Sequence, residues 1–200
     1  DAQNRLIKNI WSGGPRRTEY VHSNSSITGK IYNSSGILSE TKTHELNGSG
    51  LVAKTTYSLS PGYYIMNSYN ARKQLLSTKE YNVGGILTST SDYFYNNHSL
   101  DSVVWRTAAG VVIGRLVCTY SGNINNSIGN QHYGLAAFGW GSVKAASKKS
   151  YYNYDYSTGA LVSYEEQSNT YETDAQGRIV KLTISNPATS ESSLYQYNYY

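Results

Sequence analysis

Residues 154–183 read YDYSTGALVSYEEQSNTYETDAQGRIVKLT and contain one short unit twice. In each copy an aromatic residue or Thr precedes Asp, turn-forming residues lead to Gly, and apolar residues follow. The second copy, DAQGRIVK at residues 174–181, nearly repeats DAQNRLIK at residues 1–8. A unit that recurs near both ends of a chain indicates a repeat architecture.

A variant of the unit with Asn in place of Asp recurs at residues 32–38, 46–52, 69–76, 81–87 and 95–100. Asn and Asp accept a hydrogen bond from the backbone two residues on, and Gly adopts positive φ without steric cost. Each unit is therefore predicted to be a hairpin turn between short strands. The stretch SETKTHE at residues 39–45 is polar on both faces, which predicts an edge strand or a strand in a sheet with little cover.

The composition favours strands over helices. Ile, Leu, Val and Phe form only about a fifth of the 200 residues, but the chain has 21 Tyr, which fit a half-exposed pleated surface. We predict an all-β fold, an antiparallel meander of hairpin repeats with little helix, whose large twisted sheet could curl into a sandwich or an open barrel. It would be a single β-repeat domain over residues 1–200, with an irregular Gly- and Asn-rich insert at about residues 121–150. Within this insert, residues 142–150 could form one or two helical turns with Ser142 as N-cap.

The paired units resemble a known repeat. Tyr154-Asp155 with Gly159, and DAQGRI at residues 174–179, are similar to the tyrosine-aspartate (YD) repeats of Rhs-type and teneurin-type proteins. The Asn-containing units resemble those of small secreted or lipid-anchored bacterial proteins of unknown function. The resemblance implies an exported bacterial β-meander that is secreted, periplasmic or anchored at the outer membrane. The toxin-enclosing shells of the Rhs family need far more repeats, so that role does not carry over.

The acidic and histidine residues are not arranged for catalysis or metal binding. Asp155 and Asp174 occupy turn positions, and Glu165 and Glu166 are adjacent in a strand and point to opposite faces. No metal-ligand spacing links the four histidines, His22, His44, His98 and His132. No G-x-S-x-G elbow or phosphate-binding P-loop is present. We predict that the protein is not an enzyme and uses no metal or cofactor.

Charge and cysteine usage bear on partners and location. The net charge is +4 and the basic residues are scattered, which argues against nucleic acid as a partner. Cys118 is the one cysteine and lies in an apolar run, so a buried, inert thiol is expected. No run is long and apolar enough for a transmembrane helix. The chain looks like a mature form, and a lipid anchor would lie outside the given chain.

Aromatic residues are the best candidates for ligand binding. Tyr133, Phe138 and Trp140 lie in the insert, and exposed rings stack on sugars or anchor interfaces. The strand tyrosines Tyr63, Tyr64, Tyr93 and Tyr95 could do the same, although tyrosine could equally fill the core of a chain that is poor in Leu and Val.

The leading functional hypothesis is a non-enzymatic binding or structural module at the bacterial cell surface, with a glycan or a cell-surface protein as partner. The alternative is a carbohydrate-binding module that uses the insert aromatics. A hydrolase is a third hypothesis. It would be excluded if four aspartates lay at separate hairpin tips: Asp92, Asp101, Asp155 and Asp174. An outer-membrane barrel is disfavoured because the strands lack an unbroken lipid-facing apolar set.

Overall fold

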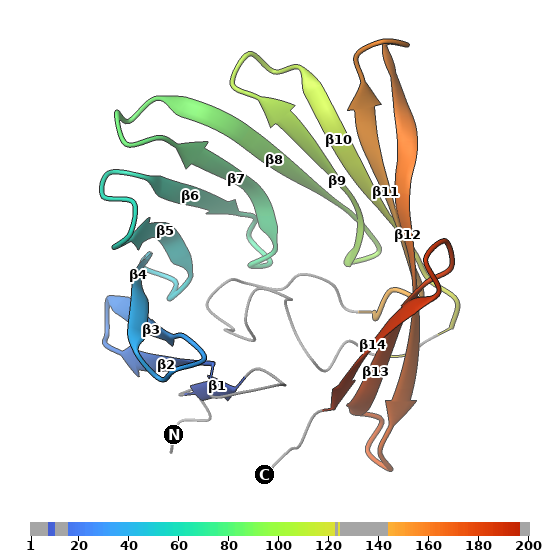
Figure 1. Ribbon diagram of the computed structural model, residues 1–200, viewed down its shortest axis with the longest axis horizontal. Coiled ribbons are helices and arrows are strands. Elements are labelled where there is room, and N and C mark those ends of the chain that lie inside the picture. The colour runs from blue at the N-terminus through green and yellow to red at the C-terminus, as the bar shows by residue number, and fades with distance from the viewer. Residues whose placement is uncertain (1–7, 11–15, 123, 125–143, 197–200) are drawn as a thin grey trace. The chain divides into compact units, whose positions relative to one another are not determined.

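The computed structural model describes residues 8–10, 16–122, 124 and 144–196 (Figure 1). Every regular element in this part of the chain is a β-strand, and the strands follow chain order in one 14-stranded sheet. The strands are β1 Lys8–Ile10, β2 Arg17–His22, β3 Ser26–Tyr32, β4 Leu38–Leu46, β5 Val52–Tyr57, β6 Tyr64–Tyr69, β7 Leu75–Tyr81, β8 Leu87–Asn96, β9 Ser99–Thr107, β10 Val112–Thr119, β11 Lys148–Asp155, β12 Ala160–Thr173, β13 Ile179–Asn186 and β14 Glu191–Gln196. This architecture confirms the predicted all-β antiparallel meander.

The chain divides into two compact units, the first holding the described residues up to Ser89 and the second those from Thr90 onward. The small core of unit 1 consists of Tyr20, Ile27 and Val52, with Leu46 packed against it. The ring of Tyr20 lies over Gly29, where an added Cβ would come within 3.3 Å of the ring. Glycine on β3 therefore makes the space that this tyrosine fills.

The core of unit 2 is richer in aromatic residues. Its buried members are Val103, Leu116, Cys118 and Ala146. Five half-buried side chains surround them: Tyr93, Leu100, Trp105, Tyr120 and Tyr151. The expected burial of Cys118 is confirmed, because only 7% of its surface is exposed.

The repeat units form the predicted hairpin turns. At Asn33 the backbone carbonyl accepts a hydrogen bond from Gly36 N, and the side-chain oxygen accepts bonds from Ser35 N and Ile37 N. Gly36 has φ of 76°, which glycine adopts without strain. The same bonds recur in the turns that begin at Asn47, Asn70, Asn82 and Asp174. A register shift accompanies several of these turns, as in a type I turn with a bulge.

Two connections have different geometries. The turn at Asp155 is one residue longer than the others. Its carbonyl accepts a hydrogen bond from the N–H of Gly159, the fifth residue of the turn, where the other turns use the fourth residue. The β8–β9 connection has only two residues, Asn97 and His98, and both have positive φ. That combination is the tight hairpin turn whose twist matches the flanking strands.

Two sequence interpretations need revision. The polar stretch 39–45 lies in β4, which is bonded to β3 on one side and β5 on the other, so the edge-strand alternative is wrong. The expected helical turns are also wrong within residues 148–150, which begin β11 and pair with both β10 and β12. Pairing on two sides satisfies the backbone better than a short isolated helix would. Ser142 lies outside the described residues.

Strand-end tyrosines have a specific structural role. The Tyr69 hydroxyl and the Asn67 amide both donate to the carbonyl of Val52, at 2.8 and 3.1 Å. In unit 2, the Tyr171 hydroxyl and the Asn169 amide donate in the same way to the carbonyl of Ala146. Each Asn-x-Tyr pair therefore satisfies a carbonyl that the sheet ladder leaves open.

Candidate functional site

One face of unit 1 gathers charged and aromatic side chains. The register places His44, Thr55, Ile65 and Glu80 in one row across β4 to β7. Lys42 lies two residues from His44 along β4, so it projects from the same face. The stretch 39–45 is polar on both faces, and on this face Glu40 and Lys42 are half-buried and His44 is buried.

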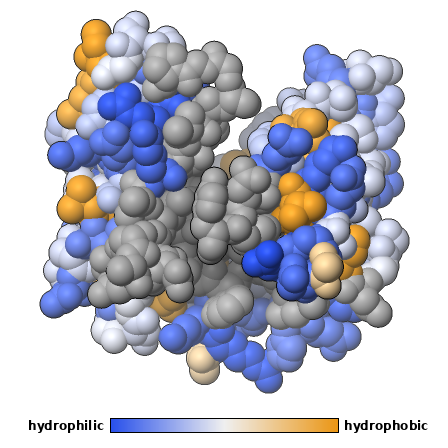
Figure 2. Space-filling model, turned by 90° about the horizontal axis from the view of Figure 1, so that it is seen from below, coloured by the Kyte–Doolittle hydropathy of each residue, from blue (hydrophilic) through white to orange (hydrophobic). Residues whose placement is uncertain are grey.

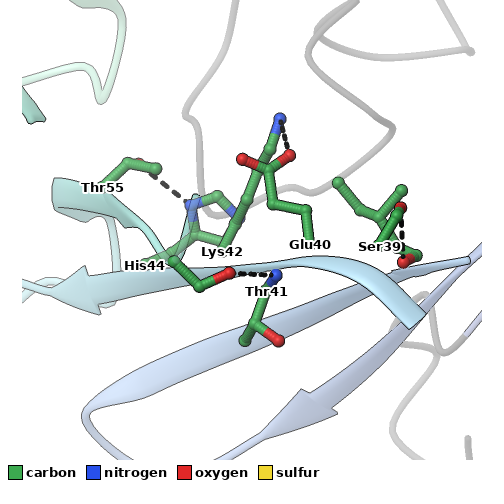
Figure 3. Close-up of polar contacts among 8 residues, drawn as sticks. Ser39, Glu40, Thr41, Lys42, His44 and Thr55 are labelled. Atoms are coloured by element: carbon green, nitrogen blue, oxygen red, sulfur yellow. Dashed lines mark hydrogen bonds and ion pairs between the residues drawn. The ribbon is translucent and has the colours of Figure 1, made fainter. Parts of the chain in front are cut away.

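Five side chains on this face form what we call the Lys42 cluster: Glu40, Lys42, Tyr57, Tyr63 and Glu80. Lys42 Nζ lies 3.8 Å from Glu40 Oε2 (Figure 3), and it lies 5.0 Å from the centroid of the Tyr57 ring. The rings of Tyr57 and Tyr63 are 5.2 Å apart and tilted by 57°, and the Tyr63 hydroxyl donates to Glu80 Oε2 at 3.2 Å. Burial, followed by the charge of Glu80, raises the pKa of the Tyr63 hydroxyl. The cluster offers two carboxylates, one ammonium group and two rings.

His44 lies beside the cluster and is the most deeply buried ionisable residue of this face, with 4% of its surface exposed. Its Nδ1 is hydrogen-bonded to Thr55 Oγ1 at 2.9 Å (Figure 3). Burial, assisted by the positive charge of Lys42, lowers the pKa of His44 to about 4. The ring is therefore neutral near pH 7 and acts as a structural hydrogen-bonding group.

The opposite face of the same strands carries a separate ring stack. Tyr64 and Tyr81 are opposite each other in register, with ring centroids 4.6 Å apart and planes within 11°. Lys54 Nζ lies 5.0 Å from the Tyr64 ring. Tyr63 and Tyr64 therefore belong to different faces, and the sequence alone gave no sign of which tyrosine would join charged residues.

Unit 2 has its own polar row. Lys149 is opposite Cys118 on β10 and Gln167 on β12, and only 7% of its surface is exposed. Burial lowers the pKa of the Lys149 ammonium group and raises the pKa of the Cys118 thiol. Tyr151 stacks parallel to Trp105, with centroids 6.5 Å apart. Cys118, Trp105 and Tyr151 belong to the packed core of unit 2, and Lys149 is buried beside Cys118.

The predicted aromatic site cannot be placed. Tyr133, Phe138 and Trp140 all lie outside the described residues. Of the strand tyrosines named with them, Tyr63 belongs to the Lys42 cluster and Tyr93 packs against the core of unit 2.

The aspartates serve turns and ion pairs. Asp155 accepts hydrogen bonds from Ser157 and Thr158, and the Ser157 hydroxyl is the main cause of its lowered pKa. Asp174 holds its own turn and also binds the guanidinium group of Arg178 at 2.7 Å. These two lie at hairpin tips as expected.

The other two aspartates lie within strands, so the placement of all four at hairpin tips that would exclude a hydrolase is not observed. Asp92 on β8 pairs with Arg106 at 3.1 Å, and Asp101 on β9 accepts a hydrogen bond from Ser102. The acidic pair Glu165 and Glu166 separates onto two faces, one contacting Gln167 and the other Lys148.

The described ranges contain neither a candidate metal cluster nor a candidate membrane-spanning helix. No group of three or more His, Cys, Asp or Glu residues there is placed to hold a metal ion. Those ranges also contain no helix with the length and apolar character needed to cross a membrane.

Comparison with known proteins gives structural relatives only. No protein-family model and no curated protein sequence matches the chain. A porin-like protein from Bacteroides uniformis ATCC 8492 is similar in structure, with a TM-score of 0.67 and 16% identity, over 98% of this chain and 83% of that one. A porin-like protein from Bacteroides vulgatus ATCC 8482 has a TM-score of 0.61 and 13% identity, over 90% and 87% of the two chains. At these identities the likeness establishes a shared fold.

Proposed function

We propose that this chain is a non-enzymatic β-repeat protein that a bacterium exports to its cell surface or outer membrane, where it serves as a binding or structural module. The observation that carries the proposal is the likeness of nearly the whole chain to porin-like proteins of two Bacteroides species. The resemblance of its turns to YD repeats supports the same location. A lipid anchor in the natural precursor is part of this proposal.

The placement of the acidic groups supports a role without catalysis. Asp155 and Asp174 use their oxygens to bind turn donors, and Asp92 is paired with Arg106. A hydrolase needs two carboxylates, or a nucleophile and a base, that converge on one substrate atom. The contacts of Asp155 and Asp174 lie within their own turns, Asp92 pairs with Arg106 on the next strand, and the three aspartates share no partner among these contacts.

Cell fractionation tests the proposed location. Cells that produce the natural full-length product with a C-terminal epitope tag are separated into cytoplasmic, periplasmic and outer-membrane fractions, and intact cells are treated with an external protease. We expect the tag in the outer-membrane or secreted fraction and cleavage in intact cells. Recovery of the tagged protein in the cytoplasmic fraction, together with full protection from the external protease, would contradict the proposal.

A glycan is the second candidate partner, and the Lys42 cluster is the observation that favours it. Carboxylates accept hydrogen bonds from sugar hydroxyls, and tyrosine rings pack on the apolar faces of sugars. The cluster places Glu40 and Glu80 beside the rings of Tyr57 and Tyr63 on one half-buried face. The insert aromatics Tyr133, Phe138 and Trp140 remain a further proposed contact.

A glycan array with matched variants separates these possibilities. If the cluster binds sugar, Tyr63→Ala weakens binding while Tyr64→Ala, on the opposite face, does not. Trp140→Ala tests the insert independently of the cluster. Absence of binding to every glycan by the folded protein would remove this candidate.

A further inference from the structure

Turns with the same sequence pattern and hydrogen bonds differ in burial between the two ends of the unit 1 strands. Residues 33–37, 47–51 and 82–86 have the same Asn-x-x-Gly-apolar pattern and the same turn hydrogen bonds. The apolar fifth residue is 6% exposed in the second turn, but 64% and 65% exposed in the first and third. Because successive antiparallel strands alternate in direction, the first and third turns lie at one end and the second at the other. The end of the sheet, rather than the local sequence, decides whether the residue is covered.

Five exposed apolar residues gather at that first end, and we call them the apolar turn end: Ile37, Leu38, Leu59, Val83 and Ile86. They come from the connections β3–β4, β5–β6 and β7–β8 and the start of β4. Figure 1 shows the β5–β6 and β7–β8 connections at the left margin. Figure 2, seen from below, shows separate hydrophobic residues in orange among hydrophilic ones along the left side. At the opposite end, Val52 and Leu75 are buried.

Unit 2, taken by itself, has the same asymmetry. Val111 and Tyr156 are exposed in the β9–β10 and β11–β12 connections, which lie at one end of their strands. Ile179 follows the β12–β13 turn at the other end and is fully buried. Exposure of apolar turn residues at one end is therefore a property of the repeat and not an accident of one loop.

The chemistry of the unit 1 tips fits a lipid surface. Residues 33–37, 58–63 and 82–86 contain no charged side chain of their own, and the Arg17 guanidinium, which lies beside Gly36, can stay at the level of the headgroups. The asparagines Asn33 and Asn82 accept hydrogen bonds from two backbone amides in their own turns, so these donors stay satisfied away from water. Separate projecting tips also suit a soft surface better than a shaped protein groove.

We propose that the apolar turn end of unit 1 inserts into the boundary between headgroups and acyl chains of a phospholipid surface, holding the protein end-on to a membrane. The adjoining sheet face carries Lys54 and Lys79 on either side of Met66, and these two charges keep the face out of the lipid, so that only the tips enter. The binding is reversible and driven by apolar area. This inference rests on the proposed surface location and specifies the partner there.

Flotation with phosphatidylcholine vesicles tests the insertion. The full chain is compared with the triple variant Ile37→Ser, Val83→Ser, Ile86→Ser and with the control Leu76→Ser, which removes an exposed apolar residue at the opposite end. We expect wild type and control to float, and the triple variant to bind at least about tenfold more weakly. The binding should persist at high salt, because the tips are uncharged.

A reporter variant measures insertion without removing apolar residues. In Val83→Trp the added fluorescence should be quenched by brominated lipids more strongly than the fluorescence of wild type. Equal quenching of Val83→Trp and wild type would overturn the proposal. Equal loss of flotation in the triple variant and in Leu76→Ser would also overturn it. The proposal would also be overturned if the protein bound only to anionic vesicles and high salt abolished that binding.

Further outcomes would identify a different occupant of this surface, or would show which of the two proposals is wrong. A dimer in analytical ultracentrifugation that the triple variant dissociates, without vesicle binding, would assign the surface to a second copy and overturn the lipid proposal. Failure to float, together with surface exposure in intact cells, would refute the insertion alone. Cytoplasmic recovery with vesicle binding intact would refute the proposed location alone.

Discussion

Acidification should destabilise this protein through His44. The ring is buried, and burial lowers its pKa in the fold to about 4 from the ordinary value of 6.5. Below pH 6.5 His44 becomes protonated in the unfolded chain but stays neutral in the folded chain. The free energy of unfolding therefore falls as the pH falls toward 4. Each pH unit in this window costs about 1.4 kcal/mol, so the whole window costs about 3 kcal/mol. That is a large share of the stability of a small domain.

Urea denaturation at several pH values, followed by circular dichroism, measures this loss. His44→Gln keeps a polar group that can bond to Thr55 but cannot take up a proton, so its stability should depend less on pH between about 6.5 and about 4.5, by roughly 2–3 kcal/mol. The control His98→Asn changes an exposed turn residue at positive φ, which Asn tolerates.

Carboxylates also respond to acid, so only the difference between variants is informative. Glu19, Asp155 and Asp174 have lowered pKa values in the fold and lose their stabilising effect as the pH falls through those values. This background is common to wild type and both variants. If His44→Gln and wild type lose stability in parallel from neutral to acid pH, the argument from His44 burial is wrong.

Three further substitutions probe the strands and turns by thermal or urea denaturation. Gly114→Ala should cost about 1–3 kcal/mol, because its Cβ would lie 2.9 Å from the Trp105 ring; an unchanged midpoint would contradict this. Lys73→Gly should stabilise by up to about 1 kcal/mol, because Lys73 holds φ of 62° in a turn where the equivalent residues are glycine, and a loss of stability would count against it. Tyr69→Phe should cost about 1 kcal/mol by removing the hydroxyl bond to the Val52 carbonyl, and a neutral effect would show that water replaces it.

The turns were predictable because their cause is local. Asn33, Asn82 and Asp174 bind backbone amides only two and four residues away, and the positive φ falls on a residue three positions on. Such contacts are encoded within five residues, so a short pattern is enough to predict them. The order of the strands followed from these turns, since a short hairpin connection pairs neighbours in sequence.

Burial was not predictable, because it depends on residues that are distant in sequence. His44 looks like one more polar residue of SETKTHE, and only the register with Ile27 and Thr55 shows that it is covered. The start of β11 at Lys148 was missed for the same reason, since its pairing partner Thr119 lies in β10. The Lys42 cluster likewise needs four strands, β4 to β7, in register before its rings and charges meet.

The pairing of each strand with its neighbour in sequence has a consequence for how the protein is made and how it evolves. A strand leaving the ribosome finds its partner already synthesised, so assembly can proceed co-translationally from one hairpin to the next. Duplicating or deleting a hairpin would lengthen or shorten the protein without rerouting any other connection. Genes for such proteins are therefore free to drift in length in steps of one hairpin.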